Sequence, residues 1–198
     1  MERRKKDRVG ILTLQGDHEA HAAAFARLGV ETAGIRTPAA LSGVDRLVIP
    51  GGESTALLKL MERWNFLDAL RDFHQRGGTL FGTCAGLILL AREVKGIDQP
   101  SLGLLDVAVE RNGYGRQRES FAVPLSVPAL GADPLDAVFI RGPRIVETGK
   151  GVEVLATLEG NPVLIRNGRV LAASFHPELT EDSRLQQYWY GARTKSAE

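Results

Sequence analysis

Cys84, the only cysteine of the chain, is the residue best suited to covalent chemistry. It lies in the segment Gly-Thr-Cys-Ala-Gly (residues 82–86), at the end of a short apolar run. Glycines two residues before and two after a nucleophile leave room for a sharp strand-to-helix turn. Such a turn exposes the thiol at the strand tip, where the N-terminus of the next helix favours the thiolate. The pattern favours a nucleophile over a buried structural thiol, which is common for free cysteine.

A candidate base for this thiol is His176, which is followed two residues later by Glu178. His176 comes directly after residues 170–175, an apolar run that predicts a strand. We expect Pro177 to keep the segment extended, so that the imidazole and the carboxylate project to the same side. The carboxylate could then accept the second ring N–H and stabilise the imidazolium. Taken alone, the segment fits a turn after an edge strand equally well.

A third motif, Pro-Gly-Gly-Glu-Ser (residues 50–54), also follows an expected strand. Its glycines could let the backbone approach a ligand and turn N–H groups toward a developing oxyanion. It fits an ordinary turn with Ser54 as a helix cap just as well. Combined with Cys84, His176 and Glu178, it indicates acyl transfer through a thioester.

The other histidines do not form a ligand cluster in the sequence. His18, His21 and His74 lie in expected helices, and each could equally be an exposed or hydrogen-bonded helix residue. With a single cysteine, no metal site is predicted.

Strands and helices alternate in the first half of the chain. Strands are expected at residues 9–14, 30–36, 45–49 and 79–83, and helices at 17–28, 54–64, 65–76 and 84–92. Short strands are expected afterwards at residues 104–110, 120–127, 137–140, 151–158, 162–166 and 170–175, before a last helix at 181–190. We therefore predict an α/β fold: a mostly parallel sheet with helices on both faces and an antiparallel extension in the C-terminal half. Ligands bind beyond the carboxyl ends of such strands, where the three motifs lie.

Bulk properties narrow the class of protein. A length of 198 residues and 43% hydrophobic content predict one domain, here residues 9–198 after a basic tail of residues 1–8. The formal charge of +1 argues against nucleic acid as a partner. No apolar run is long enough to span a membrane, and one cysteine cannot form an intrachain disulfide. We therefore expect a cytoplasmic protein.

The three motifs together resemble the class I, or triad, glutamine amidotransferase family, which implies a single-domain, three-layer, flavodoxin-like fold. Within it, further segments resemble the glutaminase subunits of pyridoxal 5′-phosphate synthase. These segments are Leu-Gln-Gly-Asp (14–17), Gly-Gly-Glu-Ser-Thr (51–55), Arg-Asn-Gly-Tyr-Gly-Arg-Gln (111–117), Glu-Ser-Phe (119–121) and Phe-Ile-Arg-Gly-Pro (139–143).

The resemblance implies hydrolysis of L-glutamine to glutamate and ammonia without a cofactor, and transfer of the ammonia to a synthase subunit of the PdxS type in a hetero-oligomeric complex. Cys84 would be the nucleophile, His176 the base and acid, and Glu178 the group that orients it. Oxyanion N–H groups would come from Gly52 and Ala85. The expected glutamine contacts are Gly52, Glu53, Ser54, Arg111, Ile140 and Arg141, and Gln15 would lie near the oxyanion site and the docking face.

Three alternatives stay open at this stage. The chain could serve another synthase, such as one making imidazole glycerol phosphate, although residues 111–117 argue against it. It could be a catalytically silent regulatory subunit, or a cysteine peptidase or amidase on a similar sheet. The resemblance also suggests weak activity without the partner, with the peptide near Gly51 and Gly52 turning into position only on docking.

Overall fold

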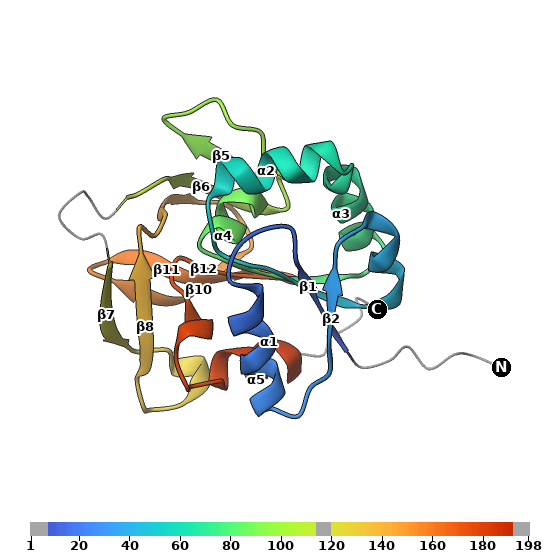
Figure 1. Cartoon of the computed structure of the whole chain (residues 1–198). Helices are drawn as coiled ribbons and strands as arrows, with labels where there is room; N and C mark the ends of the chain where they lie inside the picture. The colour runs from blue at the N-terminus through green and yellow to red at the C-terminus, as the bar shows by residue number, and fades with distance from the viewer. Residues whose placement is uncertain (1–7, 114–119, 192–198) are drawn as a thin grey trace.

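The computed structural model describes residues 8–113 and 120–191. Residues 1–7 of the basic tail, residues 114–117 of the 111–117 motif and Glu119 of the 119–121 motif therefore lie outside the described residues. The fold is built on a seven-stranded sheet in the order β10-β11-β12-β4-β3-β1-β2 (Figure 1). The parallel strands are β1 Val9–Leu12, β2 Thr32–Ile35, β3 Arg46–Ile49, β4 Thr79–Thr83 and β12 Val170–Ala173. β10 Val152–Leu158 and β11 Asn161–Asn167 extend it in antiparallel fashion, which confirms the predicted sheet.

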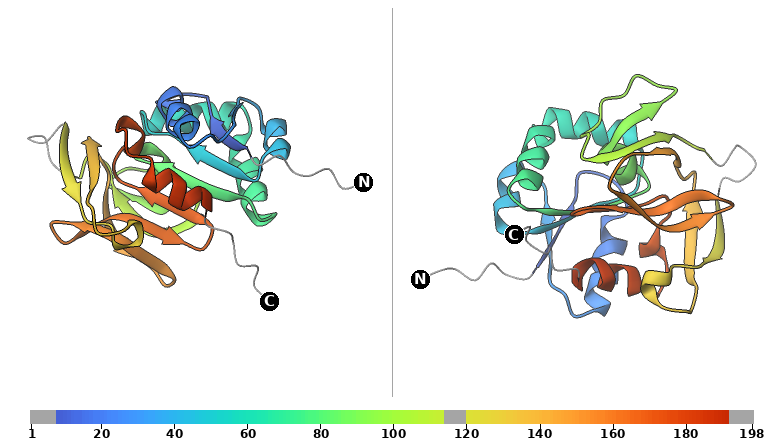
Figure 2. Two further views of the ribbon diagram at one scale, coloured as in Figure 1. Left: turned by 90° about the horizontal axis from the view of Figure 1, so that it is seen from below. Right: turned by 180° about the vertical axis from the view of Figure 1, so that it is seen from behind.

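Helices cover both faces of this sheet (Figures 1 and 2). One face carries α1 His18–Arg27 and α5 Arg184–Gly191, and the other carries α2 Ser54–Arg63, α3 Phe66–Gln75 and α4 Ala85–Leu90. Successive strand side chains point to opposite faces, so one strand contributes to both cores. In β3, Leu47 packs in the cluster of α2, α3 and α4, whereas Val48 packs in the cluster of α1 and α5. A strand buried on both faces reads as a continuous apolar run, which is why these strands were predictable.

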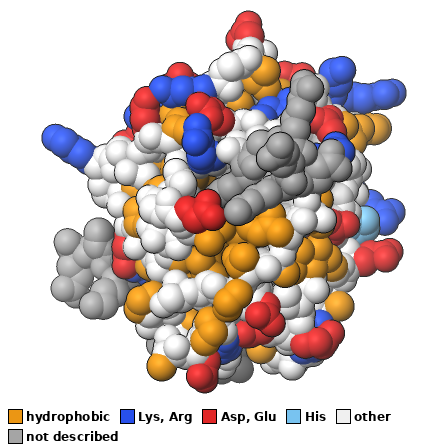
Figure 3. Space-filling view, turned by 90° about the vertical axis from the view of Figure 1, so that its left-hand side faces the viewer, with side chains coloured by type: hydrophobic (Ala, Val, Ile, Leu, Met, Phe, Trp, Pro, Cys, Tyr) orange, Lys and Arg blue, Asp and Glu red, His pale blue; other side chains and the backbone are white. Residues whose placement is uncertain are grey.

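Two smaller sheets flank the main one. The first contains β5 Ala91–Lys95, β6 Leu105–Glu110 and β9 Arg144–Thr148, and the second pairs β7 Ser120–Leu125 with β8 Leu135–Ile140. The short 3-10 helices are η1 Pro38–Gly43, η2 Pro128–Leu130 and η3 Pro177–Leu179. Figure 3 shows hydrophobic side chains gathered on the side of the molecule where β7 and β8 lie. Two exposed large hydrophobic residues, Ile140 and Val154, lie on β8 and β10.

Three local predictions were wrong. The helix after Cys84 ends at Leu90, and residues 91–95 form β5 instead of continuing it. β9 was not predicted. Both strands form because they pair with β6, a tertiary interaction that overrides weak local preference. The cap of α2 is Glu53, whose carboxylate accepts backbone N–H groups, and not Ser54, which is the first helical residue.

Among residues 8–113 and 120–191, no helix has the length and apolar character needed to cross a membrane.

Gly86 provides a test of the tight packing between α4 and β3. A Cβ atom at this position would overlap the carbonyl oxygen of Ile49. Gly86→Ala should therefore lower the free energy of unfolding by about 1–3 kcal/mol, the range for overpacking a tight site. Urea titration followed by circular dichroism measures this change.

Gly191→Ala is the matched control, because a Cβ there meets nothing within 4 Å. Equal stability of the two variants would contradict this packing account.

Candidate active site

The residues singled out by the sequence meet at the carboxyl edge of the main sheet. β4 lies between β3 and β12, with Gly82 opposite Ile49 and Thr83 opposite Ala173. The three strands therefore end at nearly the same level. This register brings Cys84, the segment after β3 and the segment after β12 to one place, as expected for an open α/β sheet.

Cys84 occupies a strained turn between β4 and α4. Its φ is 48° and its ψ is −102°, a conformation that non-glycine residues rarely adopt. Its N–H donates to the carbonyl oxygen of Ala173 at 2.9 Å, which extends the pairing with β12 past the strand end. Its Sγ lies 3.8 Å from the carbonyl oxygen of Ile140, the last residue of β8. Cys84 is buried, with only 7% of its surface exposed.

His176 and Glu178 form a buried pair beside this thiol. Nδ1 of His176 lies 2.8 Å from Oε1 of Glu178. The predicted pairing is present, but the predicted extended backbone is wrong, because Pro177 begins the 3-10 turn η3. Proline is well tolerated at the first position of a helical turn, and that turn brings i and i+2 together here. The backbone N–H of His176 donates to Val138 of β8 at 2.7 Å, which anchors the base.

The electrostatics favour a protonated base. Burial lowers the pKa of His176, but its side-chain hydrogen bonds with Cys84 and Glu178 raise that pKa to about 10. Burial raises the pKa of Glu178, yet the hydrogen bond with His176 and the positive charge of His176 bring that pKa below its usual value. The pair is therefore arranged to stabilise positive charge on the His176 imidazole next to a sulfur nucleophile.

The two glycines after β3, Gly51 and Gly52, are packed too closely against neighbouring side chains for a Cβ atom to fit. A Cβ on Gly51 would overlap Cε1 of His176 and lie 3.4 Å from Cβ of Cys84. Gly52 has φ +144°, and a Cβ there would lie 2.7 Å from Oε1 of Gln15. The side chain of Gln15, predicted to lie near this segment, therefore packs against Gly52. Ala85 is the first residue of α4, where backbone N–H groups have no partner within the helix.

Glu53 and Arg111 form an ion pair at the rim. Nη2 of Arg111 lies 2.9 Å from Oε1 of Glu53, and Nη1 donates to Oγ1 of Thr55 at 3.0 Å. Burial opposes the charge of Glu53, but the N–H groups of Ala56 and Thr55 and the charge of Arg111 lower its pKa. Ser54 is buried, with only 2% of its surface exposed.

Two other residues of the predicted glutamine set lie at the end of β8. The carbonyl oxygen of Ile140 faces Cys84, and Arg141 follows with φ 47°. A positive φ at Arg141 marks a sharp change of chain direction after the strand. The end of β8 therefore lies beside the Cys84 thiol. The Glu53–Arg111 ion pair lies at the start of α2.

His21 is a site residue that the sequence did not single out. It is fully buried on α1, with Nε2 3.1 Å from Oγ1 of Thr83 and 3.5 Å from Oε2 of Glu178. The spacing of His21, Ala24 and Phe25 could have indicated its burial, because these residues share one face of α1. The start of α1 at the carboxyl edge of the sheet could have indicated its closeness to the site. An exposed histidine was equally compatible with the sequence.

The remaining acidic group near the pair is Asp17. One carboxylate oxygen of Asp17 lies within 4.8 Å of ligand atoms of both His176 and Glu178. Asp17 is the N-cap residue of α1, and its side chain makes no hydrogen bond to the helix.

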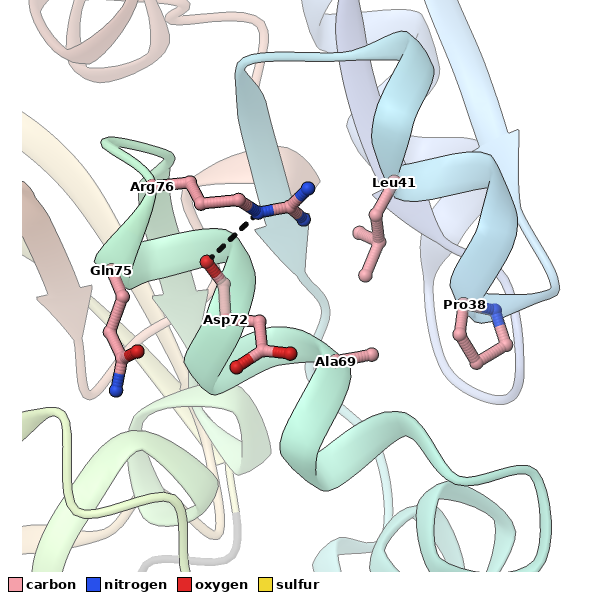
Figure 4. A pocket seen from close by; sticks show the side chains of 6 residues that line it. All are labelled: Pro38, Leu41, Ala69, Asp72, Gln75 and Arg76. Carbon is pink, nitrogen blue, oxygen red and sulfur yellow. Dashed lines mark hydrogen bonds between the residues drawn. The ribbon is translucent and has the colours of Figure 1, made fainter.

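An open pocket of ≈ 320 Å³ lies elsewhere, between η1 and α3 (Figure 4). Its walls include Pro38 and Leu41 on one side and Asp72 and Arg76 on the other, where Nε of Arg76 donates to the carbonyl oxygen of Asp72 at 3.2 Å. None of the residues named for chemistry lines it.

The family model and the curated relatives that match this chain indicate the same family. Residues 11–194 match the model of the SNO glutamine amidotransferase family. The chain is 50% identical over 182 residues to "Pyridoxal 5′-phosphate synthase subunit PdxT" of Thermotoga neapolitana, covering 92% of this chain and 97% of that protein. It is also 50% identical to the protein of that name from Geobacillus kaustophilus, covering 92% of each.

Solved structures agree with the sequence relatives. A structure described as "Crystal structure of glutamine amidotransferase" superimposes with a TM-score of 0.87 at 49% identity, covering 93% of this chain and 99% of that one. The "Structure of PurLQS from Thermotoga maritima" gives a TM-score of 0.70 at 19% identity, covering 94% and 98%. At that identity the second likeness supports the fold alone.

The raised pKa of His176 predicts a pH-dependent contribution to stability. A group whose pKa rises on folding stabilises fully below its unfolded value of 6.5, and this stabilisation is lost as pH rises through about 10. The stability difference between the unaltered chain and His176→Gln should therefore shrink steadily between these two pH values. Urea unfolding of both proteins at pH 6, 8 and 10 measures it. A difference that stays constant would show that His176 carries no such charge in the folded protein.

Proposed function

The chain belongs to the SNO glutamine amidotransferase family, and on this premise we propose that it is the glutaminase subunit of a pyridoxal 5′-phosphate synthase. It hydrolyses L-glutamine to L-glutamate and ammonia through a thioester on Cys84. The observation that carries the proposal is the 2.8 Å contact between His176 and Glu178, buried next to a strained cysteine. Relatives at 50% identity carry the name of this subunit.

The proposed chemistry begins with attack of the Cys84 sulfur on the side-chain carbonyl carbon of glutamine. His176 takes the thiol proton and delivers it to the leaving nitrogen, which departs as ammonia. A water molecule, deprotonated by His176, then hydrolyses the thioester to glutamate. Glu178 accepts the Nδ1–H of His176 and stabilises the imidazolium at each stage.

The oxyanion formed in both steps needs N–H donors, and we assign this role to Gly52 and Ala85. Ala85 starts α4, so its N–H is free for such a bond. Gly52 has a φ that favours glycine, and Gln15 packs against it. A peptide there can turn when a partner contacts Gln15. One missing oxyanion donor costs roughly 2.7–4 kcal/mol, which is enough to switch the subunit between weak and full activity.

Glutamine recognition is assigned to the rim of the site. Arg111 and Glu53 present opposite charges side by side, which complement the α-carboxylate and α-ammonium of an amino acid. The Arg111 guanidinium has five donors, so it can bind a carboxylate while keeping Thr55 as a partner. Ile140 and Arg141, at the end of β8, would contact the glutamine from the opposite side of the site. Ser54, the first residue of α2, would contact it from the start of that helix.

The ammonia is proposed to pass to a separate synthase subunit in a hetero-oligomeric complex, with no cofactor in this subunit. Ile140, whose carbonyl oxygen faces Cys84, is 39% exposed at the end of β8. Hydrophobic side chains gather on the side of the molecule where β8 lies (Figure 3). We place the reaction in the cytoplasm because the single cysteine cannot form an intrachain disulfide.

Replacing Cys84 tests the proposal. In the complex with the synthase subunit, Cys84→Ala should lower glutamine hydrolysis by roughly 10³-fold or more, because the nucleophile is lost. Pyridoxal phosphate formation should persist when ammonium salt replaces glutamine. A coupled glutamate assay and the absorbance of the product measure the two reactions.

The same assay separates the alternatives. The unaltered chain should hydrolyse glutamine much faster with the synthase subunit than alone, and comparable rates would refute the proposed switch. Retained hydrolysis in Cys84→Ala would overturn the proposed mechanism. A complex that assembles but never releases ammonia would favour a silent regulatory subunit.

A further inference from the structure

His21 is a buried titratable group that the proposed mechanism does not yet use. It lies on α1, far in sequence from His176 and Glu178, and none of its surface is exposed. Its ring meets the edge of Phe81, with centroids 6.4 Å apart and planes at 80°. Its Nε2 points to two oxygen atoms, Oγ1 of Thr83 at 3.1 Å and Oε2 of Glu178 at 3.5 Å.

The second oxygen of Glu178 lacks a conventional hydrogen bond. Oε1 of this carboxylate is bonded to His176, whereas Oε2 is buried without a hydrogen-bond partner among the described residues. A buried carboxylate oxygen without a donor is costly, because it has lost its contact with water and gained no hydrogen bond in return. The ion-pair contact of Oε2 is with Nε2 of His21, slightly beyond ideal hydrogen-bond length. A small rotation of either group would complete the bond.

The chemistry of the acceptors fixes the tautomer that can do this. A carboxylate oxygen accepts but cannot donate, so only an Nε2–H tautomer of His21 gives Oε2 of Glu178 a partner. The Thr83 hydroxyl can accept from the same N–H or rotate away, whereas Nδ1 of His21 has no hydrogen-bond partner among the described residues. The Nε2–H form is therefore the one in which the buried carboxylate is satisfied.

We propose that His21 is a positioning residue for the glutaminase reaction, in which its neutral Nε2–H holds Oε2 of Glu178 so that Oε1 stays directed at Nδ1 of His176. This proposal rests on the proposed function. It adds a fourth side chain behind Cys84, His176 and Glu178, and it assigns no contact with substrate to that side chain.

An uncharged His21 imidazole is suited to positioning Glu178. Burial lowers the pKa of His21, and the positive His176 lowers it further, while the negative Glu178 and Asp17 act in the opposite direction. These three are the charged groups that face its ring. A neutral N–H orients the carboxylate and leaves its charge available to the His176 imidazolium, whereas a second imidazolium would compete for it.

A purely structural role for His21 makes a different forecast. Its shorter contact is with Thr83 of β4, so the ring could simply tie α1 to the sheet. In that case loss of the Thr83 hydroxyl would do as much damage as loss of the imidazole. If His21 acts through Glu178, the Thr83 hydroxyl is dispensable.

The experiment compares His21→Leu, His21→Gln and Thr83→Val in the full chain bound to the synthase subunit. Leucine fills much of the volume without a donor, whereas the glutamine amide can reach the Nε2 position. His74→Leu, a half-buried histidine on α3 outside the site, is the matched control. The readouts are kcat and KM for glutamine, and the rate of Cys84 alkylation by iodoacetamide at pH 7.

His21→Leu should lower kcat about 10- to 100-fold, the usual range for loss of a group that orients an active-site ligand, with KM changed less than about twofold. Cys84 alkylation should slow as well, because a misdirected Glu178 stabilises the His176 imidazolium less well. His21→Gln should recover most of kcat. Thr83→Val and His74→Leu should stay within a few-fold of the unaltered chain.

The proposal is overturned if His21→Leu leaves kcat unchanged, if glutamine fails to rescue a folded variant, or if Thr83→Val is as damaging as His21→Leu. If His21→Leu does not fold, ¹⁵N ring shifts of the unaltered chain decide: an Nδ1–H or doubly protonated His21 at pH 7 contradicts the proposal. If the complex hydrolyses no glutamine at all, the proposed function fails, whereas the alkylation rates and ring shifts still report on His21.

Discussion

The strained backbone of Cys84 is the constraint on which the site depends. A cysteine with φ 48° and ψ −102° persists only when surrounding packing holds it. That packing comes from Gly82 and Gly86, because a Cβ on Gly82 would lie 2.7 Å from the backbone of Gly86 and one on Gly86 would overlap Ile49. The same close approach ends β4, starts α4 and directs the thiol to the sheet edge. A wider turn would move the Cys84 thiol away from His176, its proposed base.

Parallel topology makes this turn useful. Because β3, β4 and β12 end together, segments distant in sequence meet at one edge of the sheet. The segment after β12 supplies His176, and α1, which follows β1, supplies His21 behind Glu178. Burial of this group of side chains strengthens each electrostatic interaction and also makes any missing donor costly. Charge and packing are therefore linked: burial opposes the charge on the His176 imidazolium, so the paired Glu178 carboxylate must offset that cost, and every buried oxygen needs a partner.

The extent to which the sequence predicts these features follows from how local their causes are. The turn at Cys84 and the strand ends depend on nearby glycines and apolar runs, so both could be expected from the sequence. β5 and β9 depend on pairing with β6, which local propensity does not report. Glu53 replaces Ser54 as the cap because its longer side chain reaches two N–H groups. His21 was ambiguous because a histidine on an amphipathic helix gains its role only from what faces it.

The most direct test of Cys84 as a nucleophile that attacks the glutamine side chain is covalent trapping. A glutamine analogue with a diazoketone in place of the side-chain amide should alkylate the complex with the synthase subunit. Peptide mass mapping should find one adduct, on Cys84, and an excess of glutamine should slow its formation. An adduct on any other residue, or a complex that hydrolyses glutamine yet leaves Cys84 unlabelled, would contradict this account.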